Sequence, residues 1–503
     1  RGTLNGTPLS AETTGKTIVF PYKNLAFGTG YTFELPAGSV TDLTDNALAS
    51  DIRINFTTKT RPVVAKGEFD FIVPDNGSFQ DAIAAAEKRE DASRRFRVFI
   101  RNGYYKLPAS SVNKKNGNYP DPTTYLNSSN VSFIGESIDG VVITNTLPEN
   151  PSVLEGIGIG DVFDINKGVS NTYMQNLTMK SSMGDKMGRD IVLNDKGDKT
   201  ICKDVCLWAY QDTYVSNESS SRYYFEGGVL RGRTDFLCGK GDVFYKGVTL
   251  QMVGAGYLAV PSTPRKFGYV FKDCEIVGEI DRADGDKDPD GQYTLGRPWG
   301  SGTPTALFID TKMSARPSAI GWSDMGTDGY PARFAEYNSY TASGTPIDLS
   351  QRKKSFGPGN HANNPVLTKE EADAASYEAV MGSDDDWDPA SLAEQAPLPS
   401  NVKSDDVTLT WDDSDYVFCW AVCEDGKVVA FTTEPYFPVS NPNAKYSVRA
   451  ANEMGGLTEA VEAKSGTGVN TMVNATDIVK TIYVDLFGNS VLSLIHISEP
   501  TRP

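Results

Sequence analysis

The sequence predicts an all-β protein in which a right-handed parallel β-helix is flanked by small β-sandwich modules. Gly, Asn, Asp, Thr and Tyr are frequent, and turn residues recur between short β-branched or aromatic runs. A short phrase also recurs along the middle of the chain at intervals of roughly 19–28 residues, the spacing of solenoid coils. The phrases are Gln175–Met179, Lys203–Leu207, Gly227–Leu230, Lys246–Leu250 and Lys272–Ile276.

Residues 1–63 alternate apolar and polar positions, which predicts strands of a β-sandwich. The clearest examples are Tyr31–Leu35 and Ile52–Phe56. The string Leu35–Leu48 resembles bacterial Ig-like surface modules, and we expect a truncated module of that kind. Because the chain begins with Arg1, we expect that a signal peptide preceded it, as in a secreted or surface-exposed bacterial protein.

The β-helix domain is expected over residues 64–390. It begins with a short helix at Phe79–Glu87 and a strand at Phe96–Ile100. A Pro-containing stretch predicts a linker over 391–400.

Residues 401–466 resemble a fibronectin type III-like module, with strands expected at Val407–Trp411, Tyr416–Trp420 and Tyr446–Asn452. Residues 467–491 read as a bridge and a truncated secretion or anchoring module of a Bacteroidetes-type protein. Residues 492–503 resemble the translation of a sequencing adaptor, and we assign them no function.

Composition restricts the function. The net charge of -17 argues against nucleic-acid binding, which relies on Lys and Arg. A polyanionic substrate would need a basic cleft or neutralised charges. No run approaches the roughly 20 apolar residues of a membrane helix, so we expect no membrane span. We expect a monomer.

Catalysis by histidine has almost no residue to use. His361 and His496 are the only histidines, so Ser-His-Asp and Cys-His mechanisms are disfavoured. An enzyme of this composition would transfer protons through Asp, Glu, Lys or Tyr.

No metal or cofactor is expected. The six cysteines form no CxxC pair, which disfavours a zinc site, and we expect buried free thiols rather than disulfides. Cys202 and Cys206, four residues apart, should share one face of a strand. The string Asp286–Gly291 begins like a calcium loop, but its twelfth position is Arg297, so we expect a solvated acidic loop. Gly156–Gly160 reads as a turn.

Two carboxylates and one guanidinium form the candidate site. Asp212 and Asp235 are 23 residues apart, about one coil. Because stacked coils lie about 4.8 Å apart, these side chains should be neighbours. Two close carboxylates repel, so one pKa rises while the other group stays ionised, which supplies a proton donor and a nucleophile or base. Arg297 could orient the ionised partner.

The strings Gln211-Asp-Thr213, Asp235-Phe-Leu-Cys-Gly239 and Leu295-Gly-Arg-Pro-Trp299, in this order, resemble those of the pectin methylesterases. The resemblance covers roughly residues 68–385, including Gly103–Tyr105 and Phe334–Asn338. It implies a β-helix that hydrolyses galacturonate methyl esters to free carboxylates and methanol.

By position, the resemblance implies that Asp235 is the nucleophile and that Asp212 protonates methanol and then activates water. Gln211 matches a donor to the oxyanion, of a kind worth roughly 3–4 kcal/mol. Arg297 matches the residue that orients Asp235, and Trp299 an aromatic wall against a sugar ring.

Two substrate-binding assignments are less direct. Arg189 stands where the family usually has a second glutamine, and it could stabilise an oxyanion or contact a substrate carboxylate. Tyr214 and Phe236 are further substrate-binding candidates, although aromatic residues also commonly fill solenoids. The family's Gly-x-Tyr-x-Glu string ends here in Leu107, a departure at a structural position.

Two other functions remain open. The same fold and carboxylates could act on another ester, such as a thioester. Alternatively, Arg189 could mark a decayed site in a carbohydrate-binding surface β-helix. Methanol release from methylated pectin separates the first function from both alternatives.

Overall fold

The computed structural model describes residues 1–14, 17–22, 25, 27–41, 45–109, 124–146, 161–184, 189–279, 288–300, 302–326, 329–405 and 407–465. The chain divides into two compact units. One contains residues 1–64 together with Ser465, and the other contains residues 65–464. The strings Gly156–Gly160 and Asp286–Lys287, the expected C-terminal secretion module and the adaptor-like tail lie outside the described residues.

The N-terminal unit is built on an antiparallel sheet with the strand order β2-β1-β5-β6. The strands are β1 (Thr3–Leu4), β2 (Thr7–Pro8), β5 (Gly30–Leu35) and β6 (Ile52–Thr57), with a separate ribbon of β3 (Glu12–Thr14) and β4 (Thr17–Val19). Phe33 is completely buried against Phe20, 5.1 Å away between ring centroids. The two strands expected from alternation in this region are confirmed.

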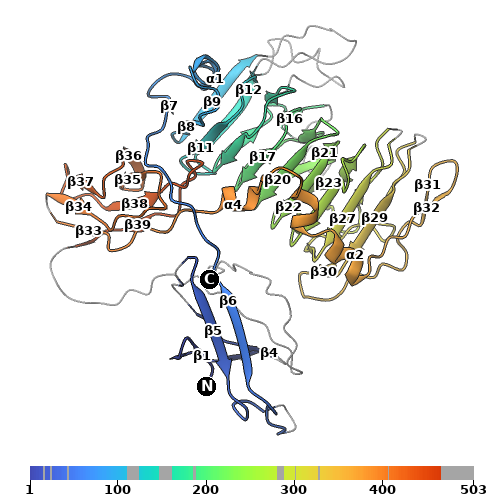
Figure 1. The fold of residues 1–503 in the computed structure, drawn as a ribbon. Coiled ribbons are helices and arrows are strands. Elements are labelled where there is room, and N and C mark those ends of the chain that lie inside the picture. The colour runs from blue at the N-terminus through green and yellow to red at the C-terminus, as the bar shows by residue number, and fades with distance from the viewer. Residues whose placement is uncertain are drawn as a thin grey trace. The chain divides into compact units, whose positions relative to one another are not determined.

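A parallel β-helix forms most of the second unit, as predicted (Figure 1). Within the described residues, one of its sheets has ten strands. They are β7 (Phe71–Val73), β8 (Phe96–Ile100), β11 (Val131–Gly135), β14 (Tyr173–Gln175), β17 (Thr200–Lys203), β20 (Arg222–Glu226), β22 (Asp242–Lys246), β24 (Tyr269–Lys272), β27 (Thr305–Ile309) and β29 (Arg333–Tyr337).

The other sheet has fourteen strands in the same described part, and each coil contributes to it before and after a bend. They are β9 (Gly103–Ala109), β10 (Tyr125–Leu126), β12 (Val141–Thr146), β13 (Phe163–Ile165), β15 (Thr178–Lys180), β16 (Leu193–Asp195), β18 (Cys206–Trp208), β19 (Tyr214–Ser216), β21 (Val229–Gly239), β23 (Thr249–Pro261), β25 (Glu275–Glu279), β26 (Thr294–Gly296), β28 (Lys312–Met313) and β30 (Tyr340–Thr341).

The recurring phrase marks a corner of the coil rather than the single strand that its composition suggests. In the phrase Lys203–Leu207, β17 ends at Lys203 and β18 begins at Cys206, with Asp204 between them at φ 48°. A left-handed residue turns the chain from one sheet to the other, and Asn, Asp and Gly adopt that conformation at least cost. Cys202 and Cys206 therefore lie on different strands, and the prediction that they share a strand face is wrong. All six cysteines are free thiols.

Aromatic rings fill the interior of the coils in register. Phe225, Tyr245, Phe271 and Phe308 occupy paired positions of four successive strands. The centroids of Phe271 and Phe308 are 4.3 Å apart, with their rings 9° from parallel. At the next position of this column, Glu336 forms a buried ion pair with Arg352. The stack fills the interior of these coils, whose spacing is set by the hydrogen bonds between parallel strands.

Helix α1 (Phe79–Lys88) packs against the first coils, as expected from its sequence. Ser78 and Asp81 form a capping box at its start, and Phe79 and Ile83 are buried. Three short helices, α2 (Lys369–Ala374), α3 (Tyr377–Met381) and α4 (Pro389–Ala393), follow the last coil.

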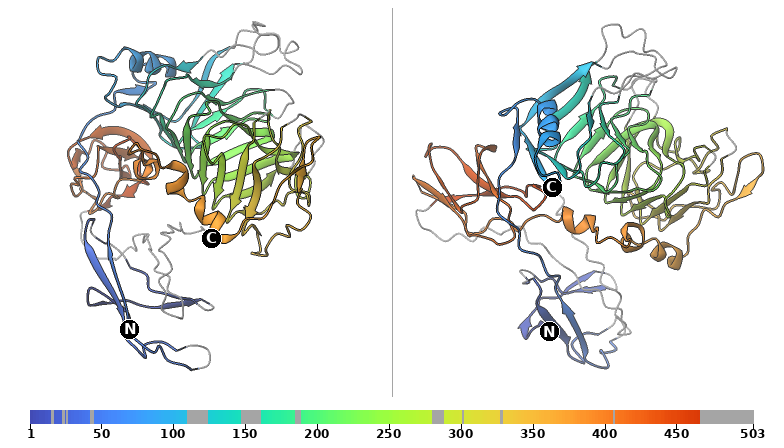
Figure 2. Two further views of the ribbon diagram at one scale, coloured as in Figure 1. Left: turned by 45° about the vertical axis from the view of Figure 1, so that its right-hand side comes forward. Right: turned by 45° about the horizontal axis from the view of Figure 1, so that its top comes forward.

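The helical segment lies along the outside of the ten-stranded sheet (Figures 1 and 2). Tyr377 packs against Tyr224 and Phe244 of this sheet, with each pair of ring centroids 5.7 Å apart. The predicted linker, 391–400, contains the end of α4, and its Ala393 and Ala396 are buried. A short ribbon of β31 (Ser355–Phe356) and β32 (His361–Ala362) precedes these helices.

Residues 403–465 form two antiparallel four-stranded sheets. The strands are β33 (Lys403–Ser404), β34 (Thr408–Thr410), β35 (Trp420–Glu424), β36 (Lys427–Thr432), β37 (Tyr436–Pro438), β38 (Tyr446–Ala450), β39 (Val461–Glu462) and β40 (Lys464–Ser465). Of the strand predicted at Tyr416–Trp420, only Trp420 is in β35. The fibronectin-like assignment of this module stays a prediction.

This module packs closely against the first coils of the solenoid. Phe69 lies beside Phe431, with ring centroids 4.6 Å apart, and the Arg97 guanidinium lies 4.1 Å from the Phe418 ring centroid. The Val428 N–H donates to Glu136, and Arg101 donates to the Val428 carbonyl. The solenoid and the module therefore share one compact unit. No helix in the described part of the chain is long and apolar enough to cross a membrane.

Candidate active site

Asp212 and Asp235 occupy equivalent bends of neighbouring coils. Asp212 lies between β18 and β19, Asp235 lies within β21, and Gln211 forms a parallel bridge with Thr234. The Asp212 N–H donates to the Thr234 carbonyl at 3.2 Å, which fixes the register. Both aspartates have left-handed backbones, with φ of 57° and 52°. Aspartate adopts this conformation at low cost, and other bends of the solenoid show it as well.

Arg297 binds Asp235 through both carboxylate oxygens. Its Nε is 2.9 Å from Oδ1 and its Nη2 is 2.6 Å from Oδ2. The guanidinium also lies 3.7 Å from the ring centroid of Tyr257. The preceding Gly296 faces Ala259, and a Cβ there would lie 2.3 Å from the Ala259 carbonyl oxygen. Glycine therefore permits the close approach of β26 and β23 that places Arg297.

The two carboxyl groups have different electrostatic environments. Burial raises the pKa of Asp212 to about 7, and the charge of Asp235 adds to the rise. Burial also raises the pKa of Asp235, but the hydrogen bonds and charge of Arg297 oppose that change. The arrangement favours a protonated Asp212 beside an ionised Asp235, as the sequence predicts for a close pair.

The carboxyl group of Asp190 holds the backbone of Gln211 in place, although the sequence does not predict Asp190 as a site residue. Asp190 accepts hydrogen bonds from the Gln211 N–H at 2.8 Å and the Tyr210 N–H at 3.2 Å. Asp190 is fully buried, and burial raises its pKa well above the ordinary value. The only sequence signal was its place beside Arg189.

Arg189 lies next to the carboxylate pair. Its Nε is 3.9 Å from Asp212 Oδ2, and its Nη2 is 3.8 Å from Asp161 Oδ1. Asp161 was not predicted as a site residue. In the sequence it immediately follows the glycine-rich string Gly156–Gly160.

The aromatic candidates separate into two groups. Trp299 is 37% exposed, so its ring remains available to a ligand. Tyr214 and Phe236 are completely buried in the main core, and the ring of Tyr214 packs 4.8 Å from that of Phe225. The prediction that Tyr214 and Phe236 contact substrate is contradicted, because their side chains point into the coil.

A small apolar cluster borders the carboxylates, and the sequence did not indicate it. It includes Ile191, Val215, Cys238 and Val260, with Tyr257 packed against them. The Cys238 Sγ lies 3.9 Å from Asp212 Oδ1, and burial keeps the pKa of this thiol well above its usual range. The apolar surroundings are consistent with the raised pKa of Asp212.

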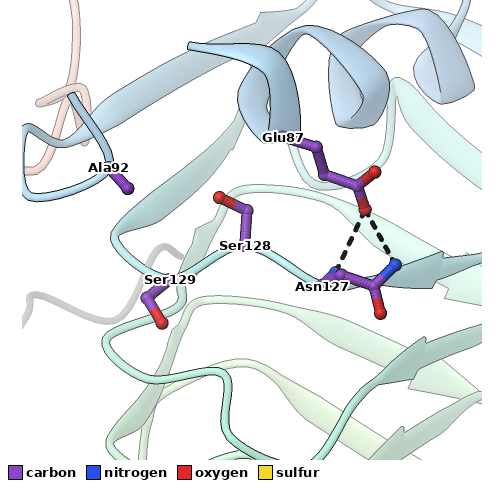
Figure 3. Close-up of a pocket in the computed structure, with 5 residues that line it drawn as sticks. All are labelled: Glu87, Ala92, Asn127, Ser128 and Ser129. Carbon is purple, nitrogen blue, oxygen red and sulfur yellow. Dashed lines mark hydrogen bonds between the residues drawn. The ribbon is translucent and has the colours of Figure 1, made fainter. Parts of the chain in front are cut away.

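A separate pocket lies beside α1 and is drawn in Figure 3. It is lined by Glu87, Ala92, Asn127, Ser128 and Ser129. Its single carboxylate, Glu87, accepts hydrogen bonds from the backbone and side-chain nitrogens of Asn127. The pocket therefore lacks a carboxylate pair. Among the described residues, no group of three or more His, Cys, Asp and Glu side chains could hold a metal ion.

Comparison with known proteins gives two family matches. The sequence model of the family described as Pectinesterase matches residues 73–377, and that of the bacterial Ig-like domain matches residues 2–58.

Curated relatives include a pectinesterase from Ralstonia nicotianae, 30% identical over 174 residues, which covers 31% of this chain and 43% of the relative. Putative pectinesterase 11 from Arabidopsis thaliana is 26% identical over 181 residues, covering 35% of this chain and 47% of the relative. The chain thus spans less than half the length of these relatives. A solved pectin methylesterase from Erwinia chrysanthemi is 21% identical, with 64% of this chain and 99% of that chain covered and a TM-score of 0.45.

Proposed function

This chain belongs to the pectinesterase family, and from that membership we propose that it hydrolyses methyl esters of galacturonate units in pectin, releasing methanol. The observation that carries the proposal is the pair Asp212 and Asp235, with Arg297 bound to only one of them. Such a pair supplies a nucleophile and a proton donor at the same ester. No cofactor is required for this chemistry.

In the first half of the proposed reaction, an Asp235 oxygen attacks the ester carbonyl carbon. The carbonyl electrons move to oxygen, and the side-chain amide of Gln211 stabilises the resulting oxyanion. When the intermediate collapses, the bond to the methoxy oxygen breaks and Asp212 gives its proton to methanol. The product of this half is a covalent anhydride between Asp235 and the galacturonate.

In the second half, the Asp212 carboxylate takes a proton from water, and the hydroxide attacks the galacturonate acyl carbon of the anhydride. The bond to Asp235 breaks and restores its carboxylate, which Arg297 again holds. The sum is one ester and one water converted to one carboxylic acid and one methanol. The acid then ionises in solvent.

The surroundings of the pair fit a methylated substrate. The cluster of Ile191, Val215 and Val260 is buried beside the carboxylates, and such apolar surroundings suit a neutral methyl ester better than a charged carboxylate. Trp299 could stack against a sugar ring from its exposed position. Because the polymer lies outside the cell, we propose a secreted, periplasmic or surface location.

The experiment is a substrate comparison with the full chain. Methanol would be measured from highly methylated pectin, beside hydrolysis of an aryl ester and a thioester. The proposal requires methanol release to exceed the hydrolysis of the other esters. A folded protein that cleaves only the aryl ester or the thioester would be an esterase for another substrate. A folded protein that cleaves none of the three would favour carbohydrate binding without catalysis.

A further inference from the structure

Three charged side chains alternate in sign beside the reacting groups: Asp161, Arg189 and Asp212. The guanidinium lies between two carboxylates at nearly equal distances, 3.8 Å to Asp161 and 3.9 Å to Asp212. Its side chain is 24% exposed, compared with 4% for Asp161 and 19% for Asp212. Partial burial limits solvent screening, so each charge acts on the others.

Asp161 is anchored independently of Arg189. Its Oδ2 accepts a hydrogen bond from Asn194 Nδ2 at 2.8 Å. Asn194 lies in β16, which pairs with β13 immediately after Asp161. Nearby, Asp164 binds the amine of Lys196 at 2.7 Å. Burial and the neighbouring Asp161 raise the pKa of Asp164 to about 8. The hydrogen bond from Asn194 therefore holds the Asp161 carboxyl group in place beside the guanidinium.

We propose that Asp161 and Arg189 act together as positioning residues that control the protonation of Asp212. The proposal rests on the assignment of Asp212 as the acid and base. Arg189 favours the carboxylate form, which exists after methanol has left and which must activate water. Asp161 attracts the same guanidinium and limits its effect, so that Asp212 is also protonated for the first half of the reaction.

These opposite effects explain how an arginine can occupy position 189, where the family resemblance implies a glutamine. A lone cation beside Asp212 would favour its ionised form, which cannot protonate methanol. The buried Asp161 counters that charge. An arginine at 189 therefore requires an acidic partner, and the fold supplies one from the preceding coil.

Other groups also act on Asp212. From β21, Asp235 raises its pKa, and the Cys238 thiol lies 3.9 Å from its Oδ1. From the loop after β26, Arg297 lowers its pKa with a smaller effect than that of Arg189. Asp190 lies at the end of the adjoining segment, where its own pKa is raised in part by Asp212. These four groups remain in place when Asp161 and Arg189 are changed.

The test removes the charges of Arg189 and Asp161 one at a time. Asp212 must be protonated for the first half-reaction, so kcat/KM on methylated pectin falls as pH rises through its pKa. Arg189→Gln removes a cation that lowers this pKa, so the alkaline fall should move to higher pH by roughly one unit. Asp161→Asn removes an anion that raises it, so the fall should move to lower pH by a smaller amount. Opposite shifts distinguish electrostatic control from general damage to the fold.

Charge-preserving and remote variants serve as controls. Arg189→Lys should keep the alkaline fall near that of the unmodified protein. Asp290→Asn and Arg316→Gln remove an ion pair with a similar acid and base, 2.6 Å apart, whose members are 36% and 59% exposed. These two variants should leave the profile unchanged.

A direct titration of Asp212 separates this proposal from the proposed function. Carbon-13 NMR of the aspartate carboxyl groups, assigned with Asp212→Asn, reports the pKa without any turnover. Opposite shifts in Asp161→Asn and Arg189→Gln would support the proposal even if pectin were not the substrate. Unchanged pKa values, shifts in the same direction, or an Arg189→Lys protein that behaves like Arg189→Gln would overturn it.

Discussion

Arg297 holds Asp235 with two parallel hydrogen bonds, Nε to Oδ1 at 2.9 Å and Nη2 to Oδ2 at 2.6 Å. A planar guanidinium matches a carboxylate in this geometry, whereas an ammonium group cannot. The contact both orients Asp235 and stabilises its charge. It therefore accounts for how two neighbouring carboxyl groups take different protonation states.

Arg297→Lys should lower kcat on methylated pectin by roughly tenfold to a hundredfold, because the two-point orientation of Asp235 is lost. Arg297→Gln should also move the acid limb of kcat/KM to higher pH, since the charge that lowers the pKa of Asp235 is absent. Both profiles can be measured by methanol release. An acid limb that stays in place in Arg297→Gln would contradict this role.

The unmodified protein should show a bell-shaped dependence of kcat/KM on pH. Activity should rise as Asp235 ionises and fall as Asp212 loses its proton near pH 7, because burial and Asp235 raise its pKa to about that value. Initial rates between pH 4 and 10 at constant ionic strength would test this. A rate that keeps rising above pH 8 would indicate that Asp212 is not the acid.

Trp299→Ala should raise KM severalfold for polymeric pectin and leave kcat nearly unchanged, because the exposed ring would bind a sugar unit rather than the reacting ester. Ile320→Ala offers a control, since Ile320 is also exposed, at 47%, and has no assigned role. If Trp299→Ala lowers kcat at an unchanged KM, the residue supports the site instead of binding the sugar.

Phe69→Ala should lower the free energy of unfolding by about 2 kcal/mol, because its ring packs against Phe99, Phe418 and Phe431 between the solenoid and the C-terminal module. Denaturant titration would measure the change, with Tyr436→Ala as a control at a 55% exposed position. Equal stabilities of the two variants would mean that this packing contributes little.

Local patterns predicted several elements accurately because their signals are contained in a few residues. Helix α1 has its capping box and apolar face within Ser78–Lys88, and β8 coincides with the predicted Phe96–Ile100. The five recurring phrases located five coils of the solenoid, but they did not reveal the corner inside each coil. A pattern of apolar spacing does not reveal that Asp204 adopts a left-handed conformation.

The sequence predicted the site residues that belong to compact strings. It did not predict the isolated residues that reach the site from other parts of the chain. Asp212, Asp235 and Arg297 are brought together as expected. Phe236 lies in one of these strings and Tyr214 directly follows another, but both rings are turned into the interior of the coil.

Asp161 and Asp190 could not be assigned from the sequence, because their roles arise from contacts between segments about 20 or more residues apart. Each is a single aspartate in a chain rich in acidic residues, so composition does not distinguish it from the others.

The most direct test of the proposed mechanism is methanol release from highly methylated pectin by the full chain, measured beside Asp235→Asn and Asp212→Asn. The account predicts release by the unmodified protein, a loss of at least roughly a thousandfold in Asp235→Asn, and a loss of roughly 10²–10⁴-fold in Asp212→Asn. Circular dichroism would verify that all three are folded. Substantial release by the folded Asp235→Asn variant would contradict the assignment of Asp235 as the nucleophile.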